Sequence, residues 1–442
     1  MTQTATGTGR AGGELVPEPL GDRIRRLRMA RNLTQRELAG SRYTRAFLGA
    51  IESGTRSPSQ EALAYLAGRL GLPVDDLLFG RPANVAAELA AQLSEARRSL
   101  SAGDLDAADR ALADIQRRAE HYRLDDVAGW ARYHRAEAQL HRGRAAQASA
   151  AYDELATDLT GPEALRAAVS ARQAYCLLVG GNAPRAVALL EERLRRLRAT
   201  PPVDPDAELR LTNALMYTFL ELGWRHRARK LEREVDAVLG RATHQEWVAQ
   251  FHAVAGQLRR DGELDEADRL LREAVRRYAE LGLTREIALC HWARGYVLLR
   301  AGRPAQAGTQ LRQARELLAE VGAVLDHAGA TLELAEARRR EGALAEAGQL
   351  AQEAARTVTD CEHRELMPEA DRVRGLVRAA QGDTAEARRL LGRSIDRYER
   401  AGLTGEVVVT CRQLADILLS TGEHGAAEAV LRRGLRAGER LS

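Results

Sequence analysis

Lysine is almost absent from this sequence of 442 residues, because Lys230 is the only one. A P-loop needs a Gly-Lys-Ser/Thr triplet, a kinase needs a lysine on a strand, and a pyridoxal-dependent enzyme needs a lysine for its Schiff base. Lys230 lies in the segment Arg-Ala-Arg-Lys-Leu-Glu, which matches none of these patterns. The sequence therefore excludes these three classes, and nearly all of its positive charge is arginine.

Aromatic residues and isoleucine are also scarce. The chain has 4 Trp, 10 Tyr, 4 Phe and six isoleucines, whereas a large β-sandwich or barrel needs many more β-branched and aromatic side chains. Hydrophobic residues still make up 45% of the chain, which is enough to bury a core. Alanine, leucine, arginine and glutamate dominate, and all four are good helix formers. The composition predicts an all-α fold.

The four cysteines form no Cys-x-x-Cys pair, so neither a zinc knuckle nor a dithiol site is indicated. They are Cys176, Cys290, Cys361 and Cys411. We expect them to be reduced thiols of a cytoplasmic protein. The N-terminus lacks the apolar segment of a signal peptide, and no apolar run approaches the roughly 18 residues of a membrane helix. We expect no membrane contact.

Catalytic motifs are missing as well. The ten histidines form no His-Glu-x-x-His pattern, and the chain has no Gly-x-Ser-x-Gly. We therefore expect no catalytic residues, no metal site and no cofactor, and we predict that the protein is not an enzyme.

Three segments differ in sequence pattern. Residues 1–19 are predicted to form a flexible arm, residues 20–80 a compact domain of five short helices, and residues 81–442 a periodic helical region. In the small domain, the capping box from Thr34 to Glu37 is predicted to open the second helix.

Two further helix starts are predicted in this domain. Thr44 or a neighbour is expected to begin the third helix. Pro58 is expected at the first position of the fourth helix, behind a second capping box. Asp75 or Asp76 is expected to cap the fifth helix.

A glycine recurs about every 40 residues in the periodic region. Alanine stands five residues after every one of these glycines, and a small residue stands seven before all but one, where Met216 occurs instead. The pattern predicts nine helical hairpins, with the glycine at the turn and the small residues at close helix contacts. The glycines are Gly103, Gly143, Gly181, Gly223, Gly262, Gly302, Gly342, Gly382 and Gly422.

This spacing of a small residue, a turn glycine and an alanine resembles the tetratricopeptide repeat over about residues 85–442. The usual repeat has 34 residues, so a period near 40 implies longer helices or loops. Another α-α solenoid is the alternative. Either fold predicts a superhelical stack of about nine hairpins that follows the small domain.

The small domain carries the positive charge of the chain. Residues 20–80 hold ten arginines against six acidic residues, a net charge of +4, which equals the net charge of the whole protein. Such a patch is what contacts to DNA phosphates require, since the release of counterions drives most of the affinity. A charge cluster alone is more often a solvated face, but here it coincides with a motif.

The motif resembles the Cro/repressor-type helix-turn-helix of the xenobiotic-response-element (XRE) family. It consists of the segment Leu-Thr-Gln-Arg-Glu-Leu-Ala at 33–39, Ile-Glu-Ser-Gly at 51–54, and the proline-led helix after Pro58. The stretch between Ala39 and Ile51 is about one residue shorter than the usual pattern. The resemblance implies that the third helix lies in the major groove of double-stranded DNA.

The family's functional positions fall on particular residues here. The resemblance implies that Gln35 bonds a phosphate and supports the reading helix, and that Arg45 reads a guanine bidentately. Arg42 and Arg56 are expected to contact phosphates, while Phe47, Leu48 and Ile51 are expected in the core. The predicted DNA-binding residues are Gln35, Arg36, Arg42, Thr44, Arg45, Ala46, Gly49, Ala50 and Arg56.

The tetratricopeptide resemblance also implies a groove lined by the first helix of each repeat. Aromatic and arginine side chains, which are favoured at binding sites, occupy many of these positions, and Asn213 is expected to bond a peptide backbone. The alternative is that the rings pack between neighbouring helices. The predicted ligand-binding residues are Trp130, Tyr133, Tyr175, Arg210, Asn213, Tyr217, Trp292, Tyr296, Arg339, Arg372 and Arg412.

The whole layout resembles the peptide-pheromone receptor regulators of quorum sensing. This resemblance implies a sequence-specific transcriptional regulator whose repeat domain binds a peptide or small-molecule signal that modulates DNA binding. The alternatives are a DNA-bound regulator whose repeats dock a protein partner, and a scaffold that does not bind DNA. A homodimer is expected, because one small helix-turn-helix domain reads too few base pairs alone.

Overall fold

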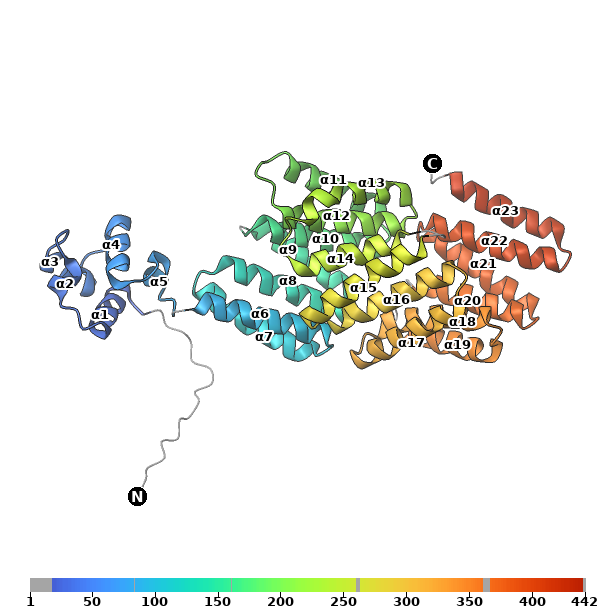
Figure 1. Cartoon of the computed structure of the whole chain (residues 1–442), viewed down its shortest axis with the longest axis horizontal. Helices are drawn as coiled ribbons and strands as arrows, with labels where there is room; N and C mark the ends of the chain where they lie inside the picture. Colours follow the sequence, from blue (N-terminus) through green and yellow to red (C-terminus); the bar gives the residue numbers. More distant parts are fainter. Residues whose placement is uncertain (1–17, 83, 160, 260–262, 361–365, 440–442) are drawn as a thin grey trace, which may run out of the picture. The chain divides into compact units, whose positions relative to one another are not determined.

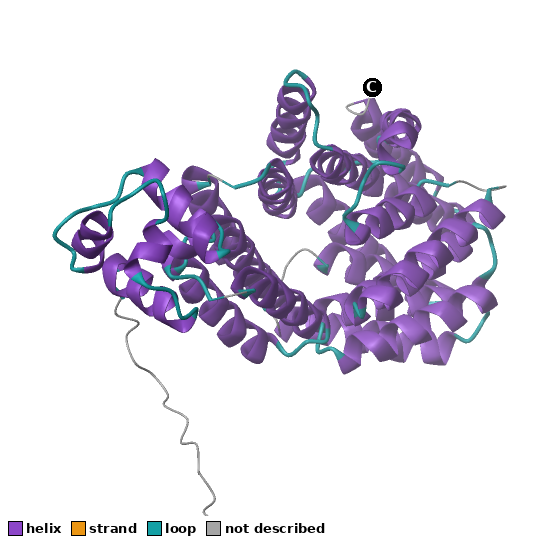
Figure 2. Ribbon diagram, turned by 60° about the vertical axis from the view of Figure 1, so that its left-hand side comes forward, coloured by secondary structure: helices purple, strands orange, loops and turns teal. Residues whose placement is uncertain are grey.

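A computed structural model describes residues 18–82, 84–159, 161–259, 263–360 and 366–439 (Figure 1). Within these ranges the regular structure is entirely helical, with 23 α-helices and no strand (Figure 2). The predicted all-α fold is therefore confirmed. The predicted N-terminal arm up to residue 17, Gly262 and Cys361 lie outside the described residues.

The chain divides into two compact units. One unit comprises residues 1–93 and 113–131, and the other comprises residues 94–112 and 132–442. The first unit thus holds the N-terminal domain together with parts of the first repeats, and the second unit holds the remaining repeats.

The N-terminal domain has the five predicted helices. Their contacts run from α1 to α3 and α5, and from α2 to α3 and α4, so that all five surround one small core. Fully buried side chains of this core include Ile24, Leu38, Leu48, Leu66 and Leu77. The helices are α1 (Leu20–Ala30), α2 (Gln35–Ala39), α3 (Arg45–Glu52), α4 (Gln60–Leu70) and α5 (Val74–Phe79).

The capping box of α2 is confirmed. The hydroxyl of Thr34 accepts a hydrogen bond from the backbone N–H of Glu37 at 3.2 Å, and the Glu37 carboxylate accepts one from the backbone N–H of Thr34 at 2.6 Å. Thr44 caps α3 in the predicted way. Side-chain acceptors therefore satisfy N–H groups in the first turns of both helices.

The fourth helix spans residues 60–70 as predicted, but the roles predicted for Pro58 and for Asp75 or Asp76 at two helix starts are wrong. Pro58 precedes α4, whose cap is Ser59, because the Ser59 hydroxyl accepts from the backbone N–H of Ala62 and so defines the first turn. Asp75 and Asp76 do not cap α5. They lie inside its first turn, where negative charge is favourable to the helix dipole.

The remaining 18 helices form nine hairpins, as predicted. The first helices of the hairpins, called A helices here, are α6 (Val85–Ser101), α8 (Asp125–His141), α10 (Glu163–Val179), α12 (Pro205–Glu221), α14 (Gln245–Gln257), α16 (Thr284–Arg300), α18 (Val324–Arg340), α20 (Met367–Ala380) and α22 (Thr404–Ser420). The second helices, called B helices, are α7 (Leu105–His121), α9 (Ala145–Asp158), α11 (Ala183–Arg198), α13 (Arg225–Leu239), α15 (Leu264–Leu281), α17 (Pro304–Glu320), α19 (Leu344–Asp360), α21 (Thr384–Arg400) and α23 (His424–Gly438).

The repeated small residues lie where the pattern predicts. The eight described turn glycines all have φ between +72° and +88°. The nine alanines that follow the turns are at most 1% exposed. At Gly295, a Cβ would lie 2.4 Å from Cγ of Leu311, so that only glycine permits this approach of α16 to α17. Met216, the exception to the pattern, is also fully buried.

Consecutive A helices contact one another from α10 through to α22. From α10 onward the A helices therefore form a continuous layer, with each B helix packed against the A helix of its own hairpin. Side chains on an A helix meet the next A helix along the chain, which decides which of the predicted groove residues remain accessible.

Candidate functional site

Helix α3 is fixed to the N-terminal domain by its inner face. Leu48 and Ile51 are at most 2% exposed, which confirms their expected place in the core. Phe47 is half-buried, and its ring stacks on that of Tyr43 with centroids 4.6 Å apart. The hydroxyl of Thr44 accepts from the backbone N–H of Phe47 at 3.1 Å and closes the first turn. The opposite face of α3 is left for a partner.

The outer face of α3 carries the predicted base-reading positions. Thr44, Arg45 and Ala46 are exposed, and Gly49 and Ala50 are half-buried. The side chain of Arg45 has no hydrogen-bond or ion-pair partner within the described part of the chain. A long, exposed and unpaired guanidinium at the first turn of this helix is suited to a base edge, and its contact with DNA stays a prediction.

A buried polar cluster ties α3 to α1 and α2. Glu52 at the end of α3 is 7% exposed and accepts hydrogen bonds from Arg28 at 2.7 and 3.0 Å and from Gln35 at 2.9 Å. Burial acts to raise the pKa of Glu52, but these donors bring it below its ordinary value. Gln35 thus supports α3 through Glu52, while its expected bond to a phosphate stays a prediction.

The role of Arg28 was missed by the sequence reasoning. The motif Ile-Glu-Ser-Gly at 51–54 contains its partner Glu52, so the acid at that place was the available signal. Nothing in the local pattern indicates which arginine, 24 residues away, would meet it.

The other arginines predicted to contact DNA differ in whether their guanidinium groups already have a partner. Arg36 is exposed. Arg42 pairs with Glu61, and Arg56 lies 4.8 Å from the ring centroid of Phe47. Arg42 would therefore have to exchange a carboxylate for a phosphate, whereas Arg56 can keep its aromatic contact. Their contacts with phosphates stay predictions.

Three of the predicted groove residues are buried between A helices. Tyr133, Arg210 and Asn213 are 4%, 4% and 0% exposed. The amide nitrogen of Asn213 donates to the backbone carbonyl of Trp247 at 2.8 Å, and Arg210 donates to Gln250 at 3.0 Å, so that both bridge α12 to α14. The expected exposure of these three side chains is wrong, because α14 covers Arg210 and Asn213, and the ring of Tyr133 lies 5.7 Å from that of Tyr152 on α9.

The remaining aromatic positions are partly accessible. Tyr175 of α10 and Tyr217 of α12 lie with ring centroids 6.4 Å apart, and both are half-buried. Trp292 packs against α18, where a Cβ at Gly329 would lie 2.3 Å from the ring. The hydroxyl of Tyr296 accepts from Arg300 at 3.2 Å. Helix packing therefore accounts for Trp292, whereas Tyr175 and Tyr217 remain partly accessible and their contact with a ligand stays a prediction.

The predicted arginines and Trp130 complete this set. Arg339 pairs with Glu336 at 2.7 Å, and Arg372 pairs with Glu369 at 2.5 Å. Arg412 is exposed on α22, and Trp130 is half-buried on α8. Binding of a ligand by any member of the set stays a prediction.

Two charged clusters on the A helices were not foreseen. In the first, Glu137 of α8 is 4% exposed and accepts from Arg172 of α10 at 3.0 Å, and it lies 2.8 Å from Nδ1 of His134. Burial opposes ionisation of Glu137, yet the charge of Arg172 brings its pKa well below its ordinary value. The cluster therefore places a buried ion pair between two A helices.

The second cluster joins the first repeat to the fifth and sixth A helices. Arg97 of α6 is 8% exposed and donates to Glu246 of α14 at 2.8 Å, and it also pairs with Glu286 of α16. The hydroxyl of Ser101 accepts from the backbone N–H of Arg285 at 3.0 Å. Burial acts to raise the pKa of Glu286, but the nearby arginines lower it to about 2.

Three glutamates of the last A helices act on one another: Glu333 of α18, Glu369 of α20 and Glu406 of α22. Burial, followed by the charge of Glu369, raises the pKa of Glu333 to about 8. The same two causes raise the pKa of Glu406. Arg372 is the cation paired with Glu369. Ionising Glu333, Glu369 and Glu406 together therefore costs free energy, because Arg372 does not offset the repulsion among three carboxylates.

Both parts of the molecule now define its class, a helix-turn-helix domain followed by a tetratricopeptide-like superhelix. Residues 19–78 match the family model described as a helix-turn-helix domain. The N-terminal domain is therefore a helix-turn-helix domain. No curated protein matches the chain by sequence.

Among solved structures, the fold is similar to that of a Rap protein complexed with competence and sporulation factor. The TM-score is 0.59 and the identity 14%, over 80% of this chain and 98% of that one. It is also similar to the Rap conjugation gene regulator of the plasmid pLS20 in complex with the Phr* peptide, with a TM-score of 0.51, an identity of 13%, and coverage of 80% and 95%. These likenesses show a shared fold.

Within the described residues, none of the helices combines the length and the apolar character needed to cross a bilayer.

Proposed function

We propose that the protein is a sequence-specific DNA-binding transcriptional regulator whose repeat domain binds a peptide or small-molecule signal that modulates DNA binding. The observation that carries this proposal is the outer face of α3. In a helix-turn-helix domain this helix reads the major groove, and here Thr44, Arg45 and Ala46 stand exposed on it. We further propose that the protein acts as a cytoplasmic homodimer of the XRE type.

The signal-binding part of the proposal is supported by the repeats. One structure with the same fold is a Rap regulator in complex with the Phr* peptide. On the A helices, Tyr175 and Tyr217 offer half-buried rings, and Arg339 and Arg372 carry guanidinium groups that are each paired with a glutamate one turn away. Rings and arginines suit an extended peptide, because they contribute contact area and bonds to carbonyl or carboxylate oxygens.

Selection of bound DNA fragments from the parent genome tests both parts. The full chain should enrich a small set of fragments, and culture extract added to the binding reaction should shift their occupancy. A coupling of about 1–3 kcal/mol between signal and DNA gives a change of roughly 5- to 150-fold. A set that is enriched equally with and without extract would support DNA binding and oppose the signal.

The alternatives have their own outcomes in the same experiment. Stable co-purification of a second protein, together with enriched DNA, favours a regulator whose repeats dock a protein partner. Failure to enrich any fragment favours a scaffold that does not bind DNA. The exposed, unpaired side chain of Arg45 on α3 favours DNA binding over a scaffold that does not bind DNA.

A further inference from the structure

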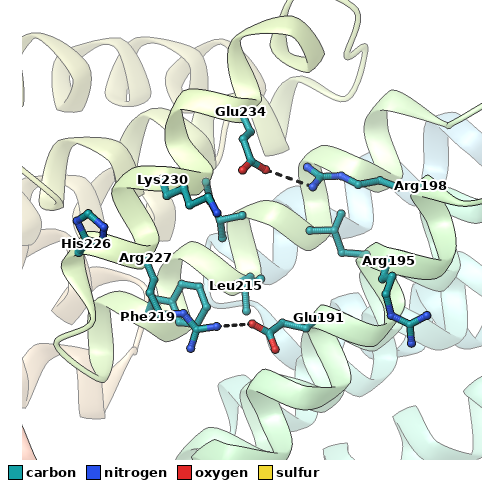
Figure 3. A pocket seen from close by; sticks show the side chains of 11 residues that line it. Glu191, Arg195, Arg198, Leu215, Phe219, His226, Arg227, Lys230 and Glu234 are labelled. Carbon is teal, nitrogen blue, oxygen red and sulfur yellow. Dashed lines mark hydrogen bonds and ion pairs between the residues drawn. The ribbon is translucent and has the colours of Figure 1, made fainter. Parts of the chain in front are cut away.

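A cleft of about 610 Å³ opens between the B helices α11 and α13 (Figure 3). Leu194 of α11 and Leu215 and Phe219 of α12 form its floor, and they are only 5%, 2% and 2% exposed. Small-molecule sites usually have volumes of roughly 300–1,000 Å³ and mainly apolar walls. The cleft thus has the size and the floor of a site for a small apolar group.

Two ion pairs cross the cleft. Arg198 of α11 lies 3.2 Å from Glu234 of α13, and Arg227 of α13 lies 2.5 Å from Glu191 of α11. Arg227 also lies 4.4 Å from the ring centroid of Phe219. Because each pair joins one B helix to the other, the pairs link the two walls and bound the cleft on two sides.

Lys230, the only lysine of the chain, lies between these two ion pairs (Figure 3). It stands on α13 one turn from Arg227 and one turn from Glu234, so that all three share one face of the helix. Lys230 is exposed and has no hydrogen-bond or ion-pair partner among the described side chains. The neighbouring Arg195 is paired with Glu192. Among Arg195, Arg198, Arg227 and Lys230, which line the cleft, Lys230 is therefore the cation without a carboxylate partner.

We propose that this cleft binds a small amphipathic anion, an aromatic or aliphatic carboxylate or sulfonate, with its apolar body on Leu215 and Phe219 and its anionic group on Lys230. Arg227 pairs with Glu191, and Arg198 is shared between Glu234 and Glu208 of α12, so Lys230 is the cation of the cleft that remains for an anionic group of the ligand. This site is separate from the signal-binding site of the proposed function, and it lies between B helices rather than on the row of A helices.

Titration of the full chain with 8-anilinonaphthalene-1-sulfonate, an aromatic sulfonate that fluoresces in apolar sites, tests the proposal. The chain should bind one equivalent saturably. Lys230→Glu should weaken this binding about tenfold or more, because a charge-assisted contact is replaced by repulsion, and Lys230→Arg should retain it. Arg110→Glu makes the same change of charge at an exposed position of α7 and should leave the binding unchanged.

Equal binding by wild-type chain and Lys230→Glu would overturn the proposal, since the dye would then occupy another apolar surface. Equal weakening by Arg110→Glu would also overturn it, because net charge alone would account for the effect. Lys230 is exposed, so its variants are expected to fold, and circular dichroism of each variant verifies this.

The lone lysine permits an independent test on the unaltered chain. 2,4,6-Trinitrobenzenesulfonate is itself an aromatic sulfonate that reacts with primary amines, and peptide mapping separates a label on Lys230 from one on the N-terminal amine. If the cleft binds such anions, the rate of labelling at Lys230 should saturate with reagent concentration and fall when 8-anilinonaphthalene-1-sulfonate is present. A rate that rises linearly and shows no protection would contradict the proposal.

Discussion

At the scale of single residues, Arg45 is the side chain on which the proposed DNA recognition most depends. We expect Arg45→Ala to weaken binding to the selected operator by about 1–3 kcal/mol while leaving binding to unrelated DNA nearly unchanged, because a bidentate contact with guanine is lost and few phosphate contacts are. Titration of operator and unrelated duplexes by fluorescence anisotropy measures both effects.

Arg56→Ala is the matched control for this prediction. Arg56 is exposed and is predicted to contact a phosphate, so its loss should lower the dependence of affinity on salt without altering the preference for sequence. An unchanged sequence preference in Arg45→Ala would show that the recognition register assigned to α3 is wrong.

The residue scale also shows why only part of the site could be predicted. Thr44 and the capping box at Thr34 act within one turn of their own helix, so local sequence is sufficient to place them. The bonds between Arg28, Gln35 and Glu52 depend on three helices meeting. Their residue types are visible in the sequence, but their partners follow from packing.

At the scale of helices and turns, two of the turn glycines separate the cost of a left-handed backbone from the cost of a steric clash. Gly382 has a φ of +88°, and a Cβ there would meet no atom within 4 Å. Gly103 has a φ of +85°, and a Cβ there would lie 2.0 Å from the backbone carbonyl oxygen of Val321. We expect Gly382→Ala to cost about 1–2 kcal/mol from the left-handed backbone alone, and Gly103→Ala to cost clearly more.

Denaturant unfolding of the two alanine variants measures this difference. The backbone strain is the same in both, so any excess at Gly103 reports the close contact with the turn before α18. Equal losses in the two variants would contradict that contact.

Contacts inside a hairpin could be predicted from the sequence, whereas contacts between neighbouring hairpins could not. The glycine and alanine periods reflect contacts inside one hairpin, which recur with the sequence, and they gave the nine hairpins correctly. The exposure of Arg210 and Asn213 depends instead on the next A helix. A periodic pattern predicts which face of a helix is inner, but not how closely the neighbouring helix covers it.

At the scale of the whole molecule, the carboxylates of the last repeats predict a dependence of stability on pH. The pKa of Glu333 is raised from its ordinary value of 4.5 to about 8, so the folded chain holds a proton there that the unfolded chain releases. This contribution to stability is fully present below about pH 4.5 and is lost as the pH rises to about 8. We expect Glu333→Gln to remove this decline, a difference of about 1–2 kcal/mol after allowance for partial exposure.

Urea unfolding of wild-type chain and Glu333→Gln at about pH 5 and about pH 8.5 measures this effect. Glu353→Gln serves as the control, because Glu353 pairs with Arg315 on the exposed B helices. A wild-type chain that is equally stable at both values, or a decline that persists in Glu333→Gln, would contradict the protonated state assigned to this carboxyl.

The second unit is also held together by contacts that run far across the chain. Arg97 of α6 reaches Glu246 and Glu286, which follow it by 149 and 189 residues, and so it closes the first repeat onto the fifth and sixth A helices. Removal of one partner from a buried ion pair leaves the others uncompensated, which typically costs about 3–5 kcal/mol. We expect Arg97→Met to lower the free energy of unfolding by this amount. The closure, which is the contact of α6 with α14 and α16, should be the first part to open.

Amide hydrogen exchange locates that loss. In Arg97→Met, residues 94–101 of α6 should exchange faster, whereas the hairpins from α18 onward should keep the protection of the wild-type chain, because their contacts are mainly with neighbours in sequence. Arg110→Met, on the exposed face of α7, should change neither region. Uniform loss of protection along the whole unit would mean that the repeats unfold as one body, and the closure would then not be a separate element of the structure.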